Sequence, residues 1–505
     1  MSNWDLQTTE LDTTGVHAAL LPTGDVLYFS YDAADENNVE RSKWQIWSES
    51  QGPLTPVANV LPRNLFCAAH CWLGNGQLLV AGGQSWNFAS SFQGADHDIH
   101  TFDPETQLWN RHRDMPAARY YPTCVTLHNG NAFIIGGLWT RVPQNRVNHE
   151  AEIFDWRSRT LSARIPFNPG FIEQLYPFTQ LLNDGSYEGL LWVHSGERAR
   201  LYSMARREWL EPTFRTITTG NRNYPKQGAA TLLPLLPSES YRSRVLLVGG
   251  GTDSEEAAAS AQIFSFNSTN PNESSYRDPL GSQPARRRFM SDAVLLADGT
   301  VLICGGAGSG VADHSHDPVF DCELFDPVTE TFRADSRINH PRMYHSSALL
   351  LPSGRVALAG NTVHWNPGNP VEDETVEVYT PDYLLRGSRP VLTIAPATVA
   401  YSELVELQTP DAALIDRVAL VRCSTVTHTN NMDQRWIGLQ IEERLMDRLK
   451  VRIPSERPIC PPGRYMFFLL DTNGVPSVAK LTFLDPSRLP DTSGCLLWSY
   501  LRNRT

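Results

Sequence analysis

The chain has 505 residues, too many for one ordinary hydrophobic core, so we expect two or more domains or one large repeat architecture. Its hydrophobic content of 41% is typical of a globular protein, and no run of about 18 apolar residues predicts a membrane span. The formal net charge of −12 argues against a nucleic-acid partner, and the basic residues 286–288 are expected to form a solvated surface.

The N-terminal residues MSNWDLQTTELDTT contain no basic segment followed by an apolar stretch, so no secretory signal is expected. At face value this predicts a cytoplasmic protein, whereas the mature form of a longer precursor would be secreted. We expect a monomer. Eight cysteines are too few for a disulfide scaffold. Cys460 and Cys495 could pair in an oxidising compartment or could both remain reduced.

Seven copies of one pattern organise the chain up to about Leu385. Each copy has an apolar run, a tight turn, a second apolar run and often a glycine pair, as in AAHCWLGNGQLLVAGG and SDAVLLADGTVLICGG. Six copies have a turn glycine, and the fifth has a longer loop at residues 238–243. These glycines are Gly24, Gly76, Gly130, Gly185, Gly299 and Gly354. The copies recur every ~50 residues, the period of kelch blades, and glycine permits the hairpin turns. We therefore predict an all-β protein with a seven-bladed β-propeller at residues 1–387; a linear solenoid fits less well.

A different pattern begins near Arg389. The segments VLTIAPATVAYSELVELQT, GRYMFFLLD and VAKLTFL follow one another as alternating strands without the glycine pairs. This pattern predicts an immunoglobulin-like β-sandwich at residues 388–505.

The repeat also predicts which residues meet at the propeller axis. The first strand of each blade should line the central channel. That strand is expected to begin nine residues before the turn glycine, so equivalent positions are found by counting back from each glycine. These positions are Gly15, Cys67, Tyr121, Tyr176, Met290 and His345, with Gln227 aligned in the fifth blade. A thiol, phenols and an imidazole converge here, and Tyr344 precedes His345. Phenolate and imidazole suit Cu(II), whereas zinc remains possible although tyrosine rarely binds it.

Five motifs in this order resemble the galactose oxidase and glyoxal oxidase family of copper radical oxidases, and the resemblance spans nearly the whole chain. They are LFCAAH, ARYYPT, GGLW, PRMYHSSALLLPSGRV and THTNNMDQR. The resemblance implies a thioether cofactor between Cys67 and Tyr121, with Trp139 stacked over the linked ring. It also implies one copper ion bound by Tyr121, Tyr344, His345 and His428. In this family pattern His428 comes from the C-terminal domain and completes the site.

The resemblance implies an oxidase that uses O2 and releases H2O2. Copper and a radical on Tyr121 would each accept one electron, Tyr344 would take the hydroxyl proton of the substrate, and Tyr121 would remove the carbon-bound hydrogen. The stretch LYPF at residues 175–178 is closer to glyoxal oxidases than to galactose oxidase, which favours a small aldehyde, as its hydrate, or a primary alcohol. Tyr176, Gln227 and His314 are the candidate substrate residues.

Other readings of these residues stay open at this point. Cys71 and Cys124 are expected to be blade core, and His70 has no evident partner. A non-catalytic kelch propeller that binds a protein partner is the main alternative to an oxidase. A zinc hydrolase is disfavoured because the axial ring contains no carboxylate base.

Overall fold

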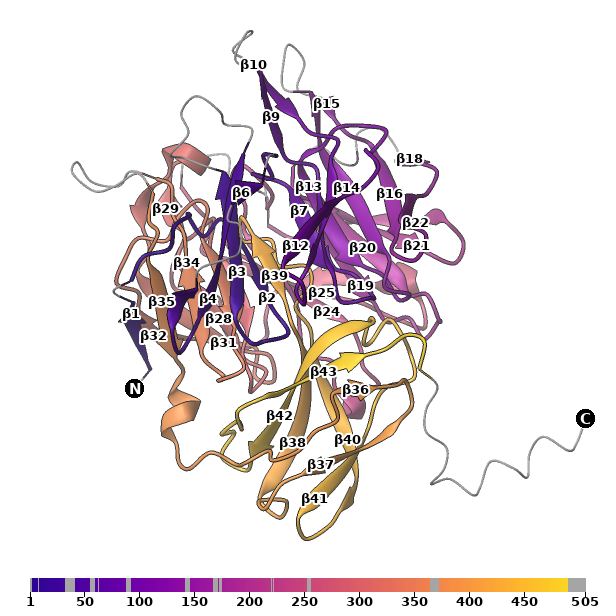
Figure 1. Ribbon diagram of the computed structural model, residues 1–505, viewed down its shortest axis with the longest axis vertical. Coiled ribbons are helices and arrows are strands. Elements are labelled where there is room, and N and C mark those ends of the chain that lie inside the picture. The colour runs from indigo at the N-terminus through magenta and orange to yellow at the C-terminus, as the bar shows by residue number, and fades with distance from the viewer. Residues whose placement is uncertain are drawn as a thin grey trace, which may run out of the picture.

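The computed structural model describes residues 2–7, 9–31, 41–54, 60–61, 63–87, 92–140, 146–166, 171, 175–218, 220, 222–251, 256–363 and 372–488. Seven antiparallel sheets radiate around one axis, and a second β domain packs against one end of that axis (Figure 1). Helix in these ranges is limited to 3-10 turns: η2 (Pro237–Glu239), η3 (Pro271–Glu273), η4 (Ala312–His314) and η5 (Asp382–Leu385). None of the helical segments described is long and apolar enough to cross a bilayer.

The blades share one strand order, from the axis outward. The innermost strands are β2 (His17–Leu20), β7 (Ala69–Trp72), β13 (Tyr120–Thr126), β19 (Phe178–Leu182), β23 (Ala229–Leu232), β27 (Asp292–Leu295) and β33 (Ser347–Leu350). The second strands are β3 (Val26–Tyr31), β8 (Leu78–Ala81), β14 (Ala132–Thr140), β20 (Leu190–Ser195), β24 (Arg244–Val248), β28 (Val301–Cys304) and β34 (Val356–Ala359). The predicted all-β, seven-bladed propeller is therefore confirmed.

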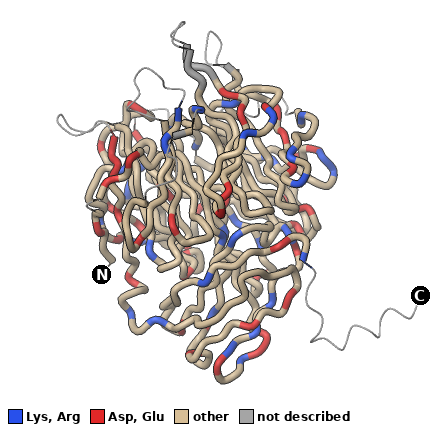
Figure 2. The backbone as a smooth tube through the Cα atoms, in the orientation of Figure 1, with Lys and Arg blue, Asp and Glu red and all other residues tan. Residues whose placement is uncertain are grey.

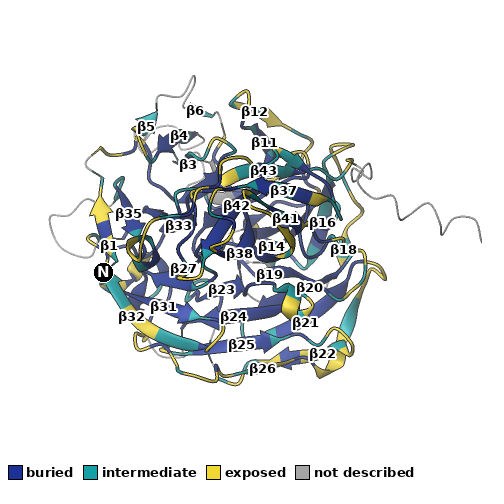
Figure 3. Cartoon of the chain, turned by 90° about the horizontal axis from the view of Figure 1, so that it is seen from below, coloured by how far each residue is buried: buried dark blue, intermediate teal, exposed yellow. Residues whose placement is uncertain are grey.

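The outer half of each blade is more exposed (Figure 3). The third strands are β4 (Ser42–Ser48), β11 (Ile99–Asp103), β16 (Glu150–Asp155), β21 (Arg198–Ser203), β25 (Ala261–Ser265), β31 (Asp321–Asp326) and β35 (Val376–Thr380). The outermost are β5 (Gly52–Leu54), β12 (Leu108–Arg111), β17 (Thr160–Leu161), β22 (Glu208–Arg215), β26 (Ser275–Arg277), β32 (Thr331–Arg337) and β1 (Asn3–Leu6). Because β1 pairs with β35, the N-terminal strand completes the seventh blade and closes the ring.

The turn glycines have the backbone conformation that the hairpins need. All six have φ between 80° and 91°, a region in which glycine carries no steric cost. In the fifth blade the loop forms η2, and Ser240 and Tyr241 take the positive φ values instead.

A buried arginine–glutamate pair recurs within three blades and corrects one sequence expectation. Arg119 pairs with Glu152, Arg288 with Glu323 and Arg342 with Glu377, and every one of these side chains is at most 3% exposed. Each arginine lies two or three residues before an axial position. Because each charge is paired and hydrogen-bonded, it is tolerated in the core and fixes the strand that leads to the axis. Arg288 was expected on a solvated basic surface and is instead buried.

The C-terminal domain is one path of seven hydrogen-bonded strands that folds into a nearly closed sandwich. Its order is β36 (Thr398–Val399), β43 (Lys480–Leu484), β42 (Gly463–Asp471), β38 (Ile415–Arg422), β40 (Trp436–Arg444), β41 (Arg448–Arg452) and β37 (Leu404–Gln408). Between β38 and β40, residues 425–435 leave the sandwich. This excursion, the axial hairpin, includes β39 (Thr425–Thr427), which pairs with the innermost strand β2 of the first blade (Figure 1).

The axial hairpin is fixed by a buried ion pair at its base. Arg422 Nε lies 2.9 Å from Asp433 Oδ1, and both side chains are at most 3% exposed. Asp433 also accepts the backbone N–H of Trp72 at 2.9 Å and the Thr126 hydroxyl at 3.0 Å. The pair therefore joins the sandwich to two propeller blades. Along the backbone, the positions of acidic and basic residues are interspersed in this view (Figure 2).

Candidate metal centre

The axial positions follow one backbone rule. Six of the seven lie two residues before the innermost strand of their blade, and Tyr121 lies within β13. Backbone bonds link neighbours: Tyr121 N–H donates to the Cys67 carbonyl at 3.0 Å, and Tyr176 N–H donates to the Tyr121 carbonyl at 3.0 Å. Five of the seven residues are non-glycine residues with φ between 48° and 70°: Cys67, Tyr121, Tyr176, Met290 and His345. This conformation costs non-glycine residues free energy, and it often marks functional sites.

Five buried side chains meet at the mouth of this ring and form what we call the axial cluster: Cys67, Tyr121, Tyr344, His345 and His428. The ligand atoms of its thiol and two imidazoles all lie within 4.8 Å of one another. The hydroxyl groups of Tyr121 and Tyr344 are hydrogen-bonded to each other. His428 reaches this cluster from the axial hairpin, where it also has a positive φ of 49°. Two domains therefore contribute to one site.

Both histidines are held by one ring nitrogen and present the other to the cluster. His345 Nδ1 is 2.5 Å from the Thr362 hydroxyl, and its Nε2 is buried with no hydrogen-bond partner. His428 Nδ1 is 2.6 Å from the Thr427 hydroxyl, and its Nε2 is 3.4 Å from Cys67 Sγ. Burial lowers the pKa of His345 to about 3 and that of His428 well below its usual value, so both rings are neutral and able to bind a metal.

The two phenols are the natural anionic ligands of the cluster. Burial is the main cause that raises the pKa of Tyr121 and Tyr344 well above the usual value, so both carry protons in the metal-free protein. The Tyr344 ring also stacks on His345, with centroids 3.6 Å apart.

These donors fit a copper ion. Two imidazole nitrogens and two phenol oxygens form an N/O set of the kind that Cu(II) prefers, and a buried unpartnered nitrogen already points into it. The group of metal-binding side chains found among the described residues contains no Asp or Glu, which disfavours Mg²⁺ and Ca²⁺.

Copper(II) affinity is expected to rise with pH. Because burial keeps Tyr121 and Tyr344 protonated without metal, each phenol that binds as phenolate releases a proton. For each proton released, the copper affinity rises about tenfold per pH unit. Competition with a chelator between about pH 6 and pH 8 measures the slope. Tyr344→Phe should lower the slope of log affinity against pH by one, whereas a pH-independent affinity would contradict phenolate binding.

Tyr176 and Gln227, which the sequence placed among the candidate substrate residues, lie against His428. Both are fully buried. The Tyr176 hydroxyl is 3.3 Å from His428 Nδ1, and Gln227 Nε2 donates to the His428 carbonyl at 2.7 Å. Repeat register placed them at the axis but did not show which side of His428 they face. Their contacts orient this histidine.

Trp139 and His314 also differ from expectation. Leu138 is buried in one cluster with Tyr121, whereas Trp139 is 47% exposed and lies where the register of β14 shifts between Leu138 and Thr140. None of the described aromatic contacts of Tyr121 involves Trp139; the ring that lies nearly parallel to Tyr121 is Tyr224. His314 is exposed in η4, and no described contact joins it to the axial cluster.

Sequence reasoning missed three residues that support the cluster: Tyr224, Thr362 and His17. His17 Nε2 accepts the backbone N–H of Cys67 at 3.2 Å, and the His17 ring stacks on Phe29. His17 lies two residues after the axial Gly15, a signal that the repeat register could have supplied. Tyr224 and Thr362 carry no comparable signal, because they lie in segments between strands.

The remaining cysteines and His70 behave as core residues. Cys71 and Cys124 are buried together, and burial together with a hydrogen bond to Cys124 raises the pKa of the Cys71 thiol. His70 is buried, with both ring nitrogens unpartnered, and burial lowers its pKa to about 3. Cys460 is buried, and its possible pairing with Cys495 falls outside the described residues.

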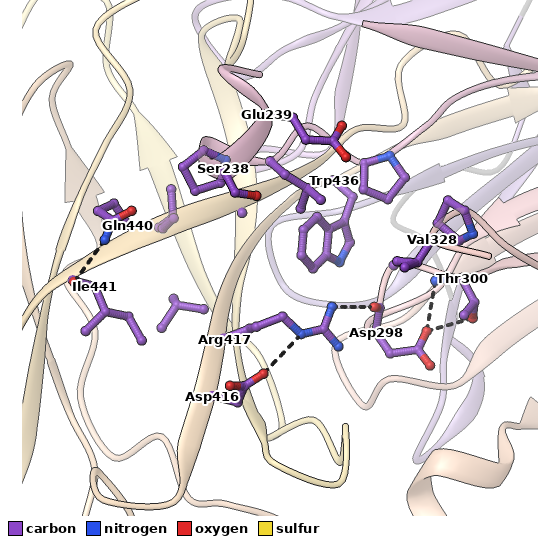
Figure 4. Close-up of a pocket in the computed structure, with 18 of the residues that line it drawn as sticks. Ser238, Glu239, Asp298, Thr300, Val328, Asp416, Arg417, Trp436, Gln440 and Ile441 are labelled. Atoms are coloured by element: carbon purple, nitrogen blue, oxygen red, sulfur yellow. Dashed lines mark hydrogen bonds and ion pairs between the residues drawn. The ribbon is translucent and has the colours of Figure 1, made fainter. Parts of the chain in front are cut away.

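One large cavity lies away from the axial cluster. It has a volume of about 910 Å³ and lies between the turns of blades five and six and strands β38 and β40 (Figure 4). Arg417, which lies across it, pairs with Asp416 and donates to the Asp298 carbonyl at 3.1 Å. It contains no residue of the axial cluster. We therefore place the functional site at the axis.

Comparisons with known proteins show the family and the fold of this chain. Residues 49–383 match the family model described as glyoxal oxidase N-terminus, and residues 389–482 match the galactose oxidase-like, Early set domain. A galactose oxidase of Gibberella zeae is 25% identical over 450 residues, which cover 86% of this chain and 63% of that protein. The aldehyde oxidase GLOX of Vitis pseudoreticulata is 28% identical over 455 residues, which cover 83% of this chain and 82% of that protein. A fungal alcohol oxidase solved in complex with copper has the same fold, with a TM-score of 0.78 at 20% identity, over 96% of this chain and 99% of that one.

Proposed function

Because this chain belongs to the glyoxal oxidase family, we propose that it is a copper radical oxidase that oxidises a small aldehyde, as its hydrate, or a primary alcohol with O2 and releases H2O2. The observation that carries this proposal is the convergence of a thiol, two phenols and two neutral imidazoles in one buried cluster. A protein-binding propeller has no need of this combination. Galactose oxidases and an aldehyde oxidase among its relatives support the same class of reaction.

The cofactor that we propose forms from two residues of the chain. Cys67 Sγ bonds to a ring carbon of Tyr121 next to the hydroxyl; the thiol and the ring each lose one hydrogen, and the two electrons and two protons reduce O2 to H2O2. Tyr121 N–H already donates to the Cys67 carbonyl, and both side chains lie in one buried cluster. Copper, when bound, supplies a one-electron acceptor. The sulfur-substituted Tyr121 supplies the second.

Tyr344 and Tyr121 have different roles in the proposed oxidation. Tyr344, as phenolate, accepts the hydroxyl proton of the bound alcohol or hydrate. The Tyr121 radical would remove a hydrogen atom from the carbon, and copper held by the axial cluster would supply the acceptor for the second electron. The alcohol becomes an aldehyde, or the hydrate becomes an acid, with loss of two electrons and two protons. O2 accepts these and leaves as H2O2, which returns the site to its starting state.

The two histidines and the residues behind them also have roles that their hydrogen bonds support. His345 and His428 bind the metal through Nε2, because Thr362 and Thr427 occupy the other nitrogens. Tyr176 and Gln227 hold His428 in place from behind.

Copper loading in air tests the proposal. The intact mass of the protein is expected to fall by two hydrogens as the thioether forms, and the loaded protein should release peroxide with methylglyoxal, glycolaldehyde or benzyl alcohol in preference to galactose. Peptide mapping locates the linkage at Cys67 and Tyr121. An unchanged mass, together with no peroxide from any substrate, would reject the proposal.

A further inference from the structure

Tyr224 covers the ring of Tyr121. The two ring centroids are 4.6 Å apart at an interplanar angle of 25°, whereas the other described rings around Tyr121 meet it at 77° or more. Tyr224 also lies 6.0 Å from the Tyr344 ring. It packs against both the buried cluster of Tyr121 and that of Tyr344. It therefore spans the two phenols of the site.

Tyr224 is partly buried against the clusters that contain these phenols. Burial is the main cause that raises the pKa of Tyr224. Tyr224 is partly exposed, whereas Tyr121 is only 4% exposed. One face of Tyr224 thus contacts the Tyr121 ring while another part of the residue meets solvent.

The backbone holds Tyr224 in this position. Tyr224 forms an isolated β-bridge with Leu175, which precedes the axial Tyr176. The preceding Asn223 is fully buried and bonds to the fourth blade: its Nδ2 donates to the Tyr176 carbonyl at 2.9 Å, and its Oδ1 accepts Gly196 N–H at 2.8 Å. The stacked arrangement is therefore built into the join between the fourth and fifth blades.

We propose that Tyr224, in place of Trp139, is the positioning residue that covers Tyr121 and shields its oxidised ring from solvent. This inference rests on the proposed function for the radical, but the cover itself exists without copper. Parallel aromatic rings attract each other, and a ring that excludes water slows the reactions that quench a radical.

Two readouts test this role. In the metal-free protein, tetranitromethane should nitrate Tyr121 in Tyr224→Leu but not in the wild type, Tyr224→Phe or Trp139→Leu. Peptide mapping by mass spectrometry locates the nitrated ring. Tyr28, which is 1% exposed in the core of the first blade, must stay unmodified, and this shows that the fold is intact.

In the copper-loaded, oxidised protein, electron paramagnetic resonance measures the lifetime of the radical. Tyr224→Leu should shorten it by about tenfold, the factor that matches the loss of one aromatic pair, whereas Trp139→Leu should change it by less than about twofold. Tyr224→Phe keeps the ring and should keep most of the lifetime, with a changed spectrum.

The outcomes separate the two proposals. Nitration of Tyr121 in Trp139→Leu but not in Tyr224→Leu would overturn the assignment of the cover, whatever copper does. A wild-type protein that forms neither thioether nor radical, yet protects Tyr121 through Tyr224, would reject the oxidase and retain the cover. A radical whose lifetime depends on Trp139 and not on Tyr224 would overturn the shielding role.

Discussion

Cys67→Ser is expected to load copper without losing two hydrogens and to reduce oxidase activity by on the order of 1,000-fold, equivalent to ~4 kcal/mol of transition-state stabilisation. Serine cannot form the thioether, so Tyr121 stays an ordinary phenol that is harder to oxidise. Only the metal then remains as a ready electron acceptor for a two-electron reaction. Intact mass after copper loading and peroxide release under matched conditions measure the two effects.

A second thiol provides the matched control. Cys71 lies four residues further along, is fully buried and belongs to the core between the second and third blades. Cys71→Ala should therefore keep the mass loss and most of the activity, with a modest decrease in stability. If the crosslink formed in Cys67→Ser, or were lost in Cys71→Ala alone, the assignment of the thioether sulfur to Cys67 would be wrong.

Asp433→Asn is expected to destabilise the protein by about 3–5 kcal/mol, because it leaves the Arg422 cation buried without its counter-ion. The carboxylate accepts three hydrogen bonds from the sandwich and two blades, and an amide cannot replace them all. The same variant should weaken copper binding, since His428 lies five residues away on the axial hairpin. Urea unfolding followed by tryptophan fluorescence measures stability, and chelator competition measures affinity.

An exposed ion pair serves as the comparison. Asp416 and Arg417 lie 3.8 Å apart with 60% and 42% of their side chains exposed, so Asp416→Asn should cost less than about 1 kcal/mol and leave copper affinity unchanged. Equal effects of the two variants would show that the buried pair does not hold the hairpin.

The repeat register carried most of the information about the site. Because the copies of the repeat superpose on one axis, counting from the turn glycines was enough to bring Cys67, Tyr121 and His345 together. His428 could not be found this way. It lies outside the repeat, and only the resemblance to the oxidase family indicated its role.

Register fixes where a backbone lies, but it does not fix which way a side chain points. Trp139 was placed over Tyr121 by motif alone, yet it lies at a register shift of β14 and is exposed beside the buried Leu138. Tyr224 was overlooked because it lies before an inner strand in a segment that does not repeat. Arg288 was read as a surface charge because its partner Glu323 is 35 residues away in sequence.

The pairing of β1 with β35 determines when the site can exist during synthesis. A nascent chain cannot close the ring until the ribosome has delivered residues up to Thr380, and it lacks one imidazole until His428 has emerged. Under the proposed function, the metal would therefore bind only after His428 has emerged and β1 has paired with β35, and a chain terminated before His428 would hold the thiol and phenols without the histidine that completes the cluster.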